Sequence, residues 1–431
     1  MAADGQNGPV TSETLASHRL VTAASIDAAA ERLAGVVVTT PLQPNDRLSA
    51  QTGANVWLKR EDLQQVRSYK IRGAYNLIAQ LDEGERAAGV IAASAGNHGQ
   101  GVALSCAQLS ISGQIFVPGT TPRQKRDRMR QLGRGFVELV VTGNTYDEAS
   151  LAAKAAAEAS GATLVSAFDD ARTIAGQGTV ARELVGQLGF APDTLIVPVG
   201  GGGLLAGCLT WMAERHPHTK VVGVEPAGAA CMAVALDAGG PRSLKHIDTF
   251  VDGAAVSRAG YLTYAIAAHH RPPLYSVPEG RVCSEMLSLY QTDGIIAEPA
   301  GALATASLGL YKPRPGETVV AIVSGGNNDV SRYSEIVERS LVYEGRKHYF
   351  LVNFPQEPGA LRQFLDEVLG PEDDITLFEY VKRSNRELGP ALVGIEVGEP
   401  SDYEGLIRRM DASPMTFEVV SPDSPFYRFL V

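Results

Sequence analysis

Three stretches of this chain follow one pattern, in which a short and continuously apolar run leads directly into a loop of small residues. The runs and their loops are Val90–Ala93 with Ser94–Gly101, Thr194–Val199 with Gly200–Gly203, and Thr318–Val323 with Ser324–Asn328. Continuously apolar strands that alternate with helices indicate a mostly parallel sheet covered on both faces. Such sheets bind ligands at the carboxyl ends of their strands. The pattern therefore predicts an α/β fold with a binding site where the three loops meet.

Composition and charge narrow the class of partner. Lys and Arg number 38 and Asp and Glu number 48, which gives a formal net charge of −10, so the chain lacks the basic surface that nucleic acid or an anionic membrane attracts. The stretch Leu195–Ala213 is uncharged and long enough to span a bilayer. Pro198 and the glycine run interrupt it, however, which favours a buried strand, loop and helix. We expect neither nucleic acid nor a membrane as a partner.

The cysteines and the N-terminus indicate the compartment. The four cysteines form no Cys-x-x-Cys pair, which argues against a disulfide framework or a zinc ribbon and fits a reducing compartment. They are Cys106, Cys208, Cys231 and Cys283. We interpret them as small buried residues and expect a cytoplasmic protein. Met1–Arg19 is polar and has no apolar core of a signal peptide, so we expect a short disordered tail there.

A change of pattern near residue 342 divides the chain. Before it, strands and helices alternate from about Ser25. After it, the predicted strands and helices follow the order βαββαβ, which is the ferredoxin-like arrangement; they are His348–Phe354, Gly359–Leu369, Asp374–Lys382, Ala391–Val397, Asp402–Met410 and Thr416–Ser421. We predict an N-terminal tail over 1–24, a catalytic domain of two α/β subdomains over 25–341, and a small α+β domain over 342–431. The small domain holds no dense set of catalytic residue types, which points to regulation or assembly.

The glycine run at Gly200–Gly203 lies between a strand and a helix. Backbone N–H groups converge at such a helix N-terminus and suit a phosphate group. The same stretch also fits a loose dinucleotide pattern, Gly201-x-Gly203-x-x-Ala206, and Glu225 ends the next strand where a ribose-binding acid would lie. A Walker loop is excluded because no Gly-Lys-Ser/Thr follows. The loop alone therefore leaves open a nicotinamide-dependent oxidoreductase.

Lys70 begins a helical stretch in the sequence Ser68-Tyr69-Lys70-Ile71-Arg72-Gly73-Ala74. A lysine in a desolvated pocket forms a Schiff base with an aldehyde cofactor, whereas hydride transfer needs no such lysine. A lone lysine is more often a solvated surface charge, and Lys59 is a nearby rival. Lys70 together with the phosphate loop nevertheless favours an aldehyde cofactor that carries a phosphate.

The motifs as a set resemble those of the threonine dehydratases, within the fold-type II pyridoxal phosphate enzymes. The resemblance covers nearly the whole chain and rests on Thr40–Leu42, Leu58–Gln64, Ser68–Ala74, Ser94–Gly101, Gly200–Leu204, Glu298–Ala302, Ser324–Asn327 and Phe354–Leu361. It implies two open, twisted, mostly parallel α/β subdomains. It also implies that the C-terminal unit is an amino-acid-sensing, ACT-like domain. Longer family members carry two such units and this chain has one.

The resemblance assigns roles to individual residues. It implies that Lys70 carries the internal aldimine, that Asn97 binds the ring hydroxyl of pyridoxal 5'-phosphate, and that Ser324 binds the ring nitrogen. A serine does not keep that nitrogen protonated as an aspartate would, which favours prompt expulsion of a β-hydroxyl. The phosphate-binding residues would be Gly200, Gly201, Gly202, Gly203 and Leu204. The substrate carboxylate would meet backbone N–H groups at Ser94, Ala95, Gly96 and His98.

These roles lead to a functional hypothesis. We expect a lyase that deaminates L-threonine to 2-oxobutyrate and ammonia, the first step of isoleucine biosynthesis. The resemblance further implies feedback inhibition by isoleucine, with valine as a second candidate effector, and a homotetramer. The alternatives are a serine racemase or a dehydratase that prefers L-serine, the nicotinamide-dependent enzyme above, and a non-catalytic amino-acid sensor.

A few acidic and histidine residues stay outside this assignment. We predict no metal site, since His216 and His218 lack the three or four converging ligands that a metal needs. Asp248 and Asp252 lie in a stretch that resembles the cation-binding segment of serine racemases, so a cation there remains an alternative. Glu298 precedes a proline near the expected site, and its sequence context gives no role for it.

Overall fold

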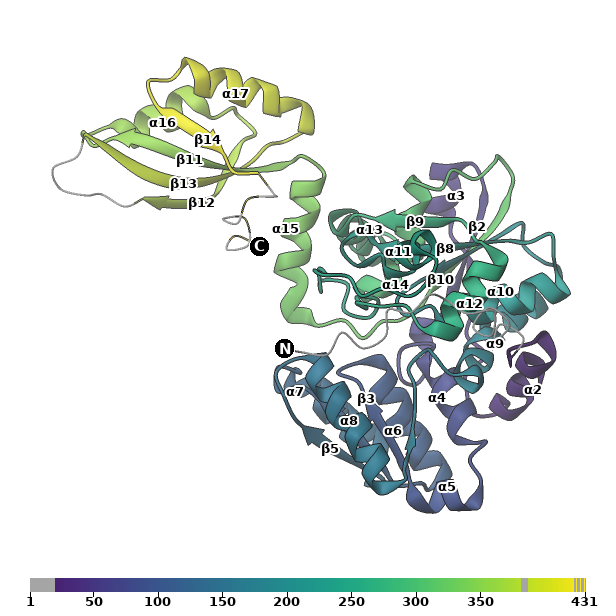
Figure 1. Ribbon diagram of the computed structural model, residues 1–431. Coiled ribbons are helices and arrows are strands. Elements are labelled where there is room, and N and C mark those ends of the chain that lie inside the picture. Colours follow the sequence, from purple (N-terminus) through teal and green to yellow (C-terminus); the bar gives the residue numbers. More distant parts are fainter. Residues whose placement is uncertain (1–19, 381–386, 422–423, 425–426, 428–429, 431) are drawn as a thin grey trace. The chain divides into compact units, whose positions relative to one another are not determined.

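A computed structural model describes residues 20–380, 387–421, 424, 427 and 430 (Figure 1). The expected tail Met1–Arg19 lies outside these residues. The chain divides into two compact units, which we describe separately. The first contains Met1–Glu279 and Ser288–Asn328, and the second contains Gly280–Leu287 and Asp329–Val431.

The larger sheet of the first unit has the strand order β1-β2-β10-β7-β8-β9. All neighbours are parallel except β1 and β2. Its strands are β1 (Leu42–Pro44), β2 (Asn55–Arg60), β7 (Thr194–Pro198), β8 (Lys220–Pro226), β9 (Leu274–Val277) and β10 (Thr318–Val323). The apolar runs Thr194–Val199 and Thr318–Val323 thus form neighbouring central strands, and their carboxyl ends lie at one edge of the sheet.

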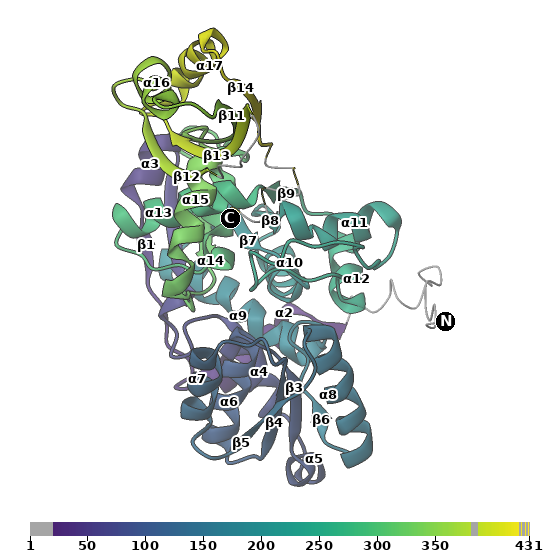
Figure 2. The same cartoon turned by 90° about the vertical axis from the view of Figure 1, so that its left-hand side faces the viewer.

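Helices cover both faces of this sheet (Figure 2). The main core lies on one face, where Leu195 of β7 and Val320 of β10 belong to the same apolar cluster as Ile26, Ile174 and Leu205 from three helices. On the other face α14 contacts the central strands. The helices around this sheet are α2 (Ala23–Leu33), α3 (Asp46–Thr52), α9 (Ala171–Leu188), α10 (Gly203–Arg215), α11 (Cys231–Ala238), α12 (Tyr261–His270) and α14 (Pro299–Ala306), and α13 (Glu279–Gln291) is divided between the two units.

The second sheet of this unit has the order β5-β4-β3-β6, with every neighbouring pair parallel. Successive side chains of β3 point to opposite faces of this sheet: Ala92 packs with α4, α6 and α7, and Ile91 packs with α8. Its elements are β3 (Val90–Ala93), β4 (Gly113–Val117), β5 (Val137–Val141), β6 (Thr163–Leu164), α4 (Lys70–Ile78), α5 (Glu83–Ala88), α6 (Asn97–Leu109), α7 (Arg123–Gly133) and α8 (Tyr146–Ser160). Two mostly parallel α/β subdomains therefore build the first unit, as the sequence predicts.

The second unit contains a four-stranded antiparallel sheet in the order β12-β13-β11-β14. Phe350 and Val352 of β11 pack with Phe364 of α16 and Leu406 of α17 in one core. Its elements are α15 (Tyr333–Tyr343), β11 (Lys347–Pro355), α16 (Ala360–Val368), β12 (Asp374–Tyr380), β13 (Leu388–Glu396), α17 (Tyr403–Ala412) and β14 (Thr416–Val419). The predicted order βαββαβ is confirmed. The expected end of the second strand, at Lys382, lies outside the described residues.

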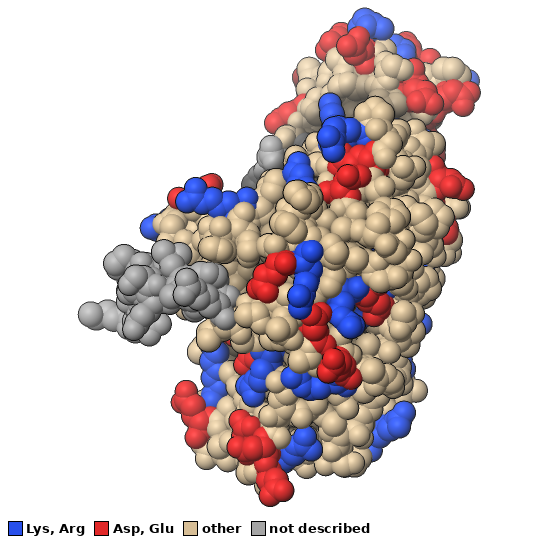
Figure 3. All heavy atoms as spheres, turned by 90° about the vertical axis from the view of Figure 1, so that its right-hand side faces the viewer, with Lys and Arg blue, Asp and Glu red and all other residues tan. Residues whose placement is uncertain are grey.

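Two further predictions concern the uncharged stretch Leu195–Ala213 and the four cysteines. The uncharged stretch Leu195–Ala213 forms β7, the glycine loop and α10, as expected from Pro198 and the glycines. Among the helices of the described residues, none is long and apolar enough to cross a membrane. All four cysteines are buried as free thiols. On the face drawn in Figure 3, side chains of both charge signs are interspersed.

Candidate active site

Lys70 is the first residue of α4 and lies beside the loop that follows β10. The N–H of Tyr69 donates to the Ser324 carbonyl at 3.2 Å, and Ser68 forms an isolated antiparallel bridge with Gly325. The register of β10 with β2 extends to the pair Val323 and Arg60, so both chain segments leave the sheet at the same edge. The carboxyl end of β10 thus fixes the start of α4.

The Lys70 amine is partly buried, and one backbone carbonyl is its hydrogen-bond partner among the described residues. Its Nζ donates to the carbonyl of Ala167 at 3.2 Å and lies 5.2 Å from the centre of the Tyr69 ring. Burial lowers the pKa of Lys70 to about 8, against the opposing charge of Glu298. A lysine with a lowered pKa is more often neutral and so more nucleophilic. Lys70 therefore has the electrostatic character that a Schiff-base lysine needs.

The glycine loop lies next to the segment that meets the Lys70 amine. A Cβ on Gly201 would lie 2.4 Å from the Phe168 ring, and one on Gly203 would lie 2.4 Å from Oε1 of Gln177. Gln177 in turn donates to the Ala167 carbonyl at 3.1 Å. Side chains are thus excluded at Gly201 and Gly203, and bare backbone lines this part of the site.

Backbone conformation adds to the requirement for glycine. Gly202 has φ +93° and caps the N-terminus of α10, a conformation that residues with a Cβ rarely adopt. A Cβ on Gly200 would lie 3.0 Å from the backbone of Ala254. Leu204 is buried in the first turn of α10. The loop therefore presents backbone N–H groups and a helix N-terminus, which together attract a phosphate.

Asn97 is the first residue of α6 and stands in a chain of polar side chains. Asn327 Nδ2 donates to Asn97 Oδ1 at 2.6 Å, and Asn97 Nδ2 donates to Glu298 Oε1 at 2.5 Å. Asn327 Nδ2 also donates to the carbonyl of Val66 at 2.8 Å, which fixes the orientation of both amides. One N–H of the Asn97 amide remains for a further acceptor.

Ser324 follows β10 directly and is buried. Its hydroxyl donates to the Ala300 carbonyl in α14 at 3.1 Å. The oxygen lone pairs of this hydroxyl are therefore held in a fixed direction. The structure thus places Ser324, Lys70 and Asn97 around the loops at the carboxyl ends of β10 and β3, and their roles toward a cofactor stay predictions.

The loop after β3 is held by its own polar atoms. Ser94 Oγ accepts from the N–H of Gly96 at 3.2 Å, and Ala95 and Gly96 lead into the first turn of α6. His98 donates from Nε2 to the Val165 carbonyl at 2.8 Å, since a carbonyl only accepts. Burial, with the charge of Lys70, lowers the pKa of His98 to about 4, so its ring is neutral. His98 therefore brings no positive charge to this loop, and the role of its backbone N–H toward a carboxylate stays a prediction.

Several sequence candidates lie outside this group. Lys59 is fully buried, and its amine is bonded to Glu183 at 2.5 Å. Glu225 accepts the N–H groups of Met232 and Ala233, so it caps α11. Asp252 pairs with Lys125 at 2.7 Å.

Two further points concern possible metal ligands and residues near Lys70 that the sequence did not point to. The described residues contain no group of three or more His, Cys, Asp or Glu side chains that could hold a metal ion. Sequence reasoning assigned no role to Glu298 and did not single out Ala167 or Phe168, which carry no motif signal.

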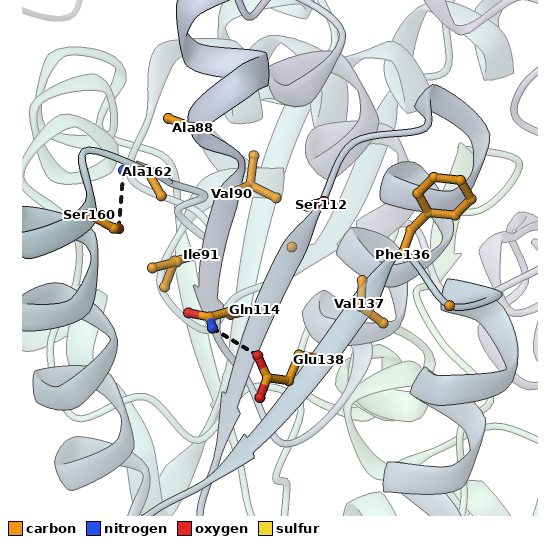
Figure 4. A pocket seen from close by; sticks show the side chains of 12 residues that line it. Ala88, Val90, Ile91, Ser112, Gln114, Phe136, Val137, Glu138, Ser160 and Ala162 are labelled. Atoms are coloured by element: carbon orange, nitrogen blue, oxygen red, sulfur yellow. Dashed lines mark hydrogen bonds between the residues drawn. The ribbon is translucent and has the colours of Figure 1, made fainter.

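One surface pocket lies away from this group (Figure 4). It is lined by residues at the amino ends of β3, β4 and β5, including Val90, Gln114 and Glu138. The candidate residues lie at the opposite, carboxyl ends of the strands. Because ligands of parallel sheets bind at carboxyl ends, this pocket is not the candidate active site.

Comparison with known proteins identifies the family. Residues 33–325 match the family of pyridoxal-phosphate-dependent enzymes, and residues 338–430 match the C-terminal regulatory domain of threonine dehydratase. The biosynthetic L-threonine dehydratase of Mycobacterium tuberculosis is 62% identical over 410 residues, which are 95% of this chain and 96% of that protein. This chain belongs to the biosynthetic threonine dehydratase family.

More distant relatives include a second threonine dehydratase and solved structures of the same fold. The biosynthetic L-threonine dehydratase of Bacillus subtilis is 48% identical over 418 residues, with 97% of this chain and 99% of that protein covered. Threonine deaminase isoform 2 from Solanum lycopersicum superposes with a TM-score of 0.70 at 36% identity, over 79% of this chain and 93% of that chain. Maize serine racemase superposes with a TM-score of 0.69 at 28% identity, over 75% of this chain and 99% of that chain.

The residues of this threonine dehydratase family member fit pyridoxal phosphate. The glycine loop leaves no space for a Cβ at Gly201 or Gly203 and presents a helix N-terminus for a phosphate. The Lys70 amine has a lowered pKa and a single carbonyl partner among the described residues. An anion cradle and a reactive amine on adjoining segments are what an aldehyde cofactor with a phosphate requires.

Proposed function

We propose that this chain is an L-threonine ammonia-lyase, which converts L-threonine to 2-oxobutyrate and ammonia as the first step of isoleucine biosynthesis. The observation that carries the proposal is the placement of the Lys70 amine beside the glycine loop, in a chain of the threonine dehydratase family. When bound, pyridoxal phosphate supplies an aldehyde for an amine and a ring that takes up the electron pair released at the α-carbon.

The chain's own residues bind and orient the reactants. Gly200–Leu204 would hold the phosphate through backbone N–H groups and the N-terminus of α10. Asn97 would direct its remaining N–H at the ring oxygen, and Ser324 would face the ring nitrogen. The first turn of α6, with the loop 94–98, would hold the threonine carboxylate by the same helix-terminus effect. These contacts would place the α-carbon next to Lys70.

Lys70 would move the proton. Lys70 would hold the aldehyde of the cofactor and would be released when the amine of threonine takes its place. The neutral Lys70 amine would then accept the α-proton, and the β-hydroxyl would leave with a proton as water. The released enamine tautomerises to an imine, which one water hydrolyses, so threonine yields 2-oxobutyrate and ammonia with no net gain or loss of water. The lowered pKa of Lys70 supports this role, because a base must be largely neutral at the working pH.

We extend the proposal to regulation and assembly. The match of residues 338–430 to a threonine dehydratase regulatory domain supports inhibition by isoleucine, with valine as a second effector. Isoleucine must bind two states of the enzyme with different affinity for this to occur. A homotetramer and a cytoplasmic location complete the proposal. The domain boundary proposed from sequence, between Leu341 and Val342, falls in α15 of the second unit.

One assay tests the proposed function. Formation of 2-oxoacid is measured for the purified protein with L-threonine and with L-serine, each with and without isoleucine. We expect turnover of threonine, a visible absorption band that borohydride bleaches, and inhibition by isoleucine. A colourless protein that binds a nicotinamide cofactor, or one that releases no ammonia from threonine, would contradict the proposal. Faster turnover of serine than threonine would reassign the substrate.

A further inference from the structure

Glu298 precedes α14 but does not cap it. Short polar side chains at this position accept an N–H of the first helical turn, and the Glu298 carboxylate makes no such bond. Its Oε1 instead accepts from Asn97 Nδ2 at 2.5 Å. The side chain is 4% exposed. The carboxylate therefore points away from the N-terminus of α14 and lies among the candidate cofactor-binding residues.

Two glycines make room for this carboxylate. A Cβ on Gly325 would lie 2.2 Å from Glu298 Oε1, and one on Gly253 would lie 3.3 Å from it. The backbone N–H of Glu298 donates to the Gly325 carbonyl at 3.1 Å. Because Gly325 also pairs with Ser68, Glu298 is tied through one residue to the segment that begins α4 at Lys70.

The charges around Glu298 come from several elements. Asp252 repels the carboxylate, and Lys125 of α7, which pairs with Asp252, attracts it. The negative charge of Glu298 in turn acts to raise the pKa values of Lys70 and Tyr69. Burial is the main cause that raises the pKa of Glu298 to about 7, and the hydrogen bonds from Asn97 and from the Asn327 backbone act against it.

We propose that Glu298 is a positioning residue of the active site, whose carboxylate orients the Asn97 amide and whose negative charge stabilises the protonated Schiff-base link at Lys70. This inference rests on the proposed function. The amide of Asn97 has two N–H groups, and Glu298 accepts from one, so the other would be directed at the ring oxygen of the cofactor. A single carboxylate thus controls one hydrogen bond to the cofactor and the charge balance at Lys70.

The two effects can be separated by substitution. Glu298→Gln keeps an oxygen that accepts from Asn97 but removes the charge. Glu298→Asp keeps the charge but withdraws it from Asn97 by one methylene. Glu317→Gln is a matched control, because Glu317 is also buried and accepts from Thr194 and Tyr311 at the amino end of β10. That end is opposite the site.

The readout is the pH titration of the visible Schiff-base band of the holoenzyme, together with the Kd for pyridoxal phosphate. A nearby opposite charge raises the pKa of a cation by about 1 to 3 units. We therefore expect Glu298→Gln to move the midpoint of this titration at least about one unit to lower pH, with Kd changed less than tenfold. Glu317→Gln should match the wild type. A Glu298→Gln midpoint equal to that of the wild type overturns the inference.

Glu298→Asp decides the question if the Gln variant does not fold. Loss of the Asn97 contact should raise the Kd for the cofactor about tenfold, the usual effect of losing one charge-assisted hydrogen bond. An unchanged Kd in Glu298→Asp overturns the inference. Failure of the proposed function gives a different result, because the wild type itself would then show no bleachable band.

Discussion

Two lysines, Lys59 fully buried and Lys70 partly buried, lie eleven residues apart in the first unit, and their surroundings differ. Lys59 is fully buried, and its Nζ donates to Thr40 O at 2.7 Å, Gln187 Oε1 at 2.8 Å and Glu183 Oε1 at 2.5 Å. Lys70 donates to one backbone carbonyl at 3.2 Å. Burial lowers the pKa of both amines. A lowered pKa therefore does not by itself mark a reactive lysine; the number of bound partners distinguishes them.

The region around Lys59 also determines where Lys70 lies. Arg72, two residues after Lys70, donates from Nε and one terminal nitrogen to both oxygens of Glu61 at 2.8 Å. The same guanidinium donates to Glu183 at 2.9 Å, and Glu183 also binds Lys59. This buried ionic cluster of Lys59, Glu61, Arg72 and Glu183 joins β2, the first turn of α4 and α9. It holds the start of α4 and so directs the Lys70 amine.

Replacing Lys70 with alanine is the largest expected change in activity. We expect threonine deamination to fall by about a thousandfold or more, since both the covalent link and the base are lost. The fold should survive because alanine suits the first turn of a helix. Ammonia release and circular dichroism are measured on the same preparation. Near-normal elimination by Lys70→Ala would refute the assignment of Lys70.

These two lysines show which features a single sequence can predict and which it cannot. The strands around Lys70 are continuous apolar runs and could be predicted, and Lys70 could be proposed as a candidate because it stands in a local motif. Nothing local distinguished Lys59 from a reactive lysine, because Glu183 lies 124 positions away. Glu298 binds Asn97 across 201 positions. Contacts of that kind depend on the tertiary fold, and a single sequence carries no periodicity or motif that reveals them.

Breaking the ionic cluster should affect stability more than chemistry. Arg72→Met leaves Glu61, which is fully buried, without its main partner. Removing one partner of a buried ion pair costs about 3–5 kcal/mol, so we expect a loss of that size in the free energy of unfolding, measured with urea. The tilt of α4 should also change, which lowers kcat in the fraction that stays folded. Unaltered stability would show that the cluster does not hold α4.

Lys59→Met should have a smaller effect of the same kind. Glu183 keeps its bond to Arg72 in this variant, and the apolar stem of methionine fills part of the space. Losing hydrogen bonds to a charged group costs about 1.5–3 kcal/mol, so the free energy of unfolding should fall by about 2 kcal/mol. Activity of the folded protein should stay within a few-fold of the wild type. A loss of activity as large as that of Lys70→Ala would reverse the roles assigned to the two lysines.

The smallest effect concerns pH in the cofactor-free protein. Lys70 reacts with the aldehyde of pyridoxal phosphate only as the neutral amine, and its pKa is lowered to about 8. The rate of Schiff-base formation should therefore rise about tenfold per pH unit below pH 8 and level off above it, whereas an ordinary lysine would continue to gain up to about pH 10.4. Stopped-flow absorbance follows the reaction, and Lys59→Met should give the same curve. A rate that rises through pH 10 would mean that burial does not activate Lys70.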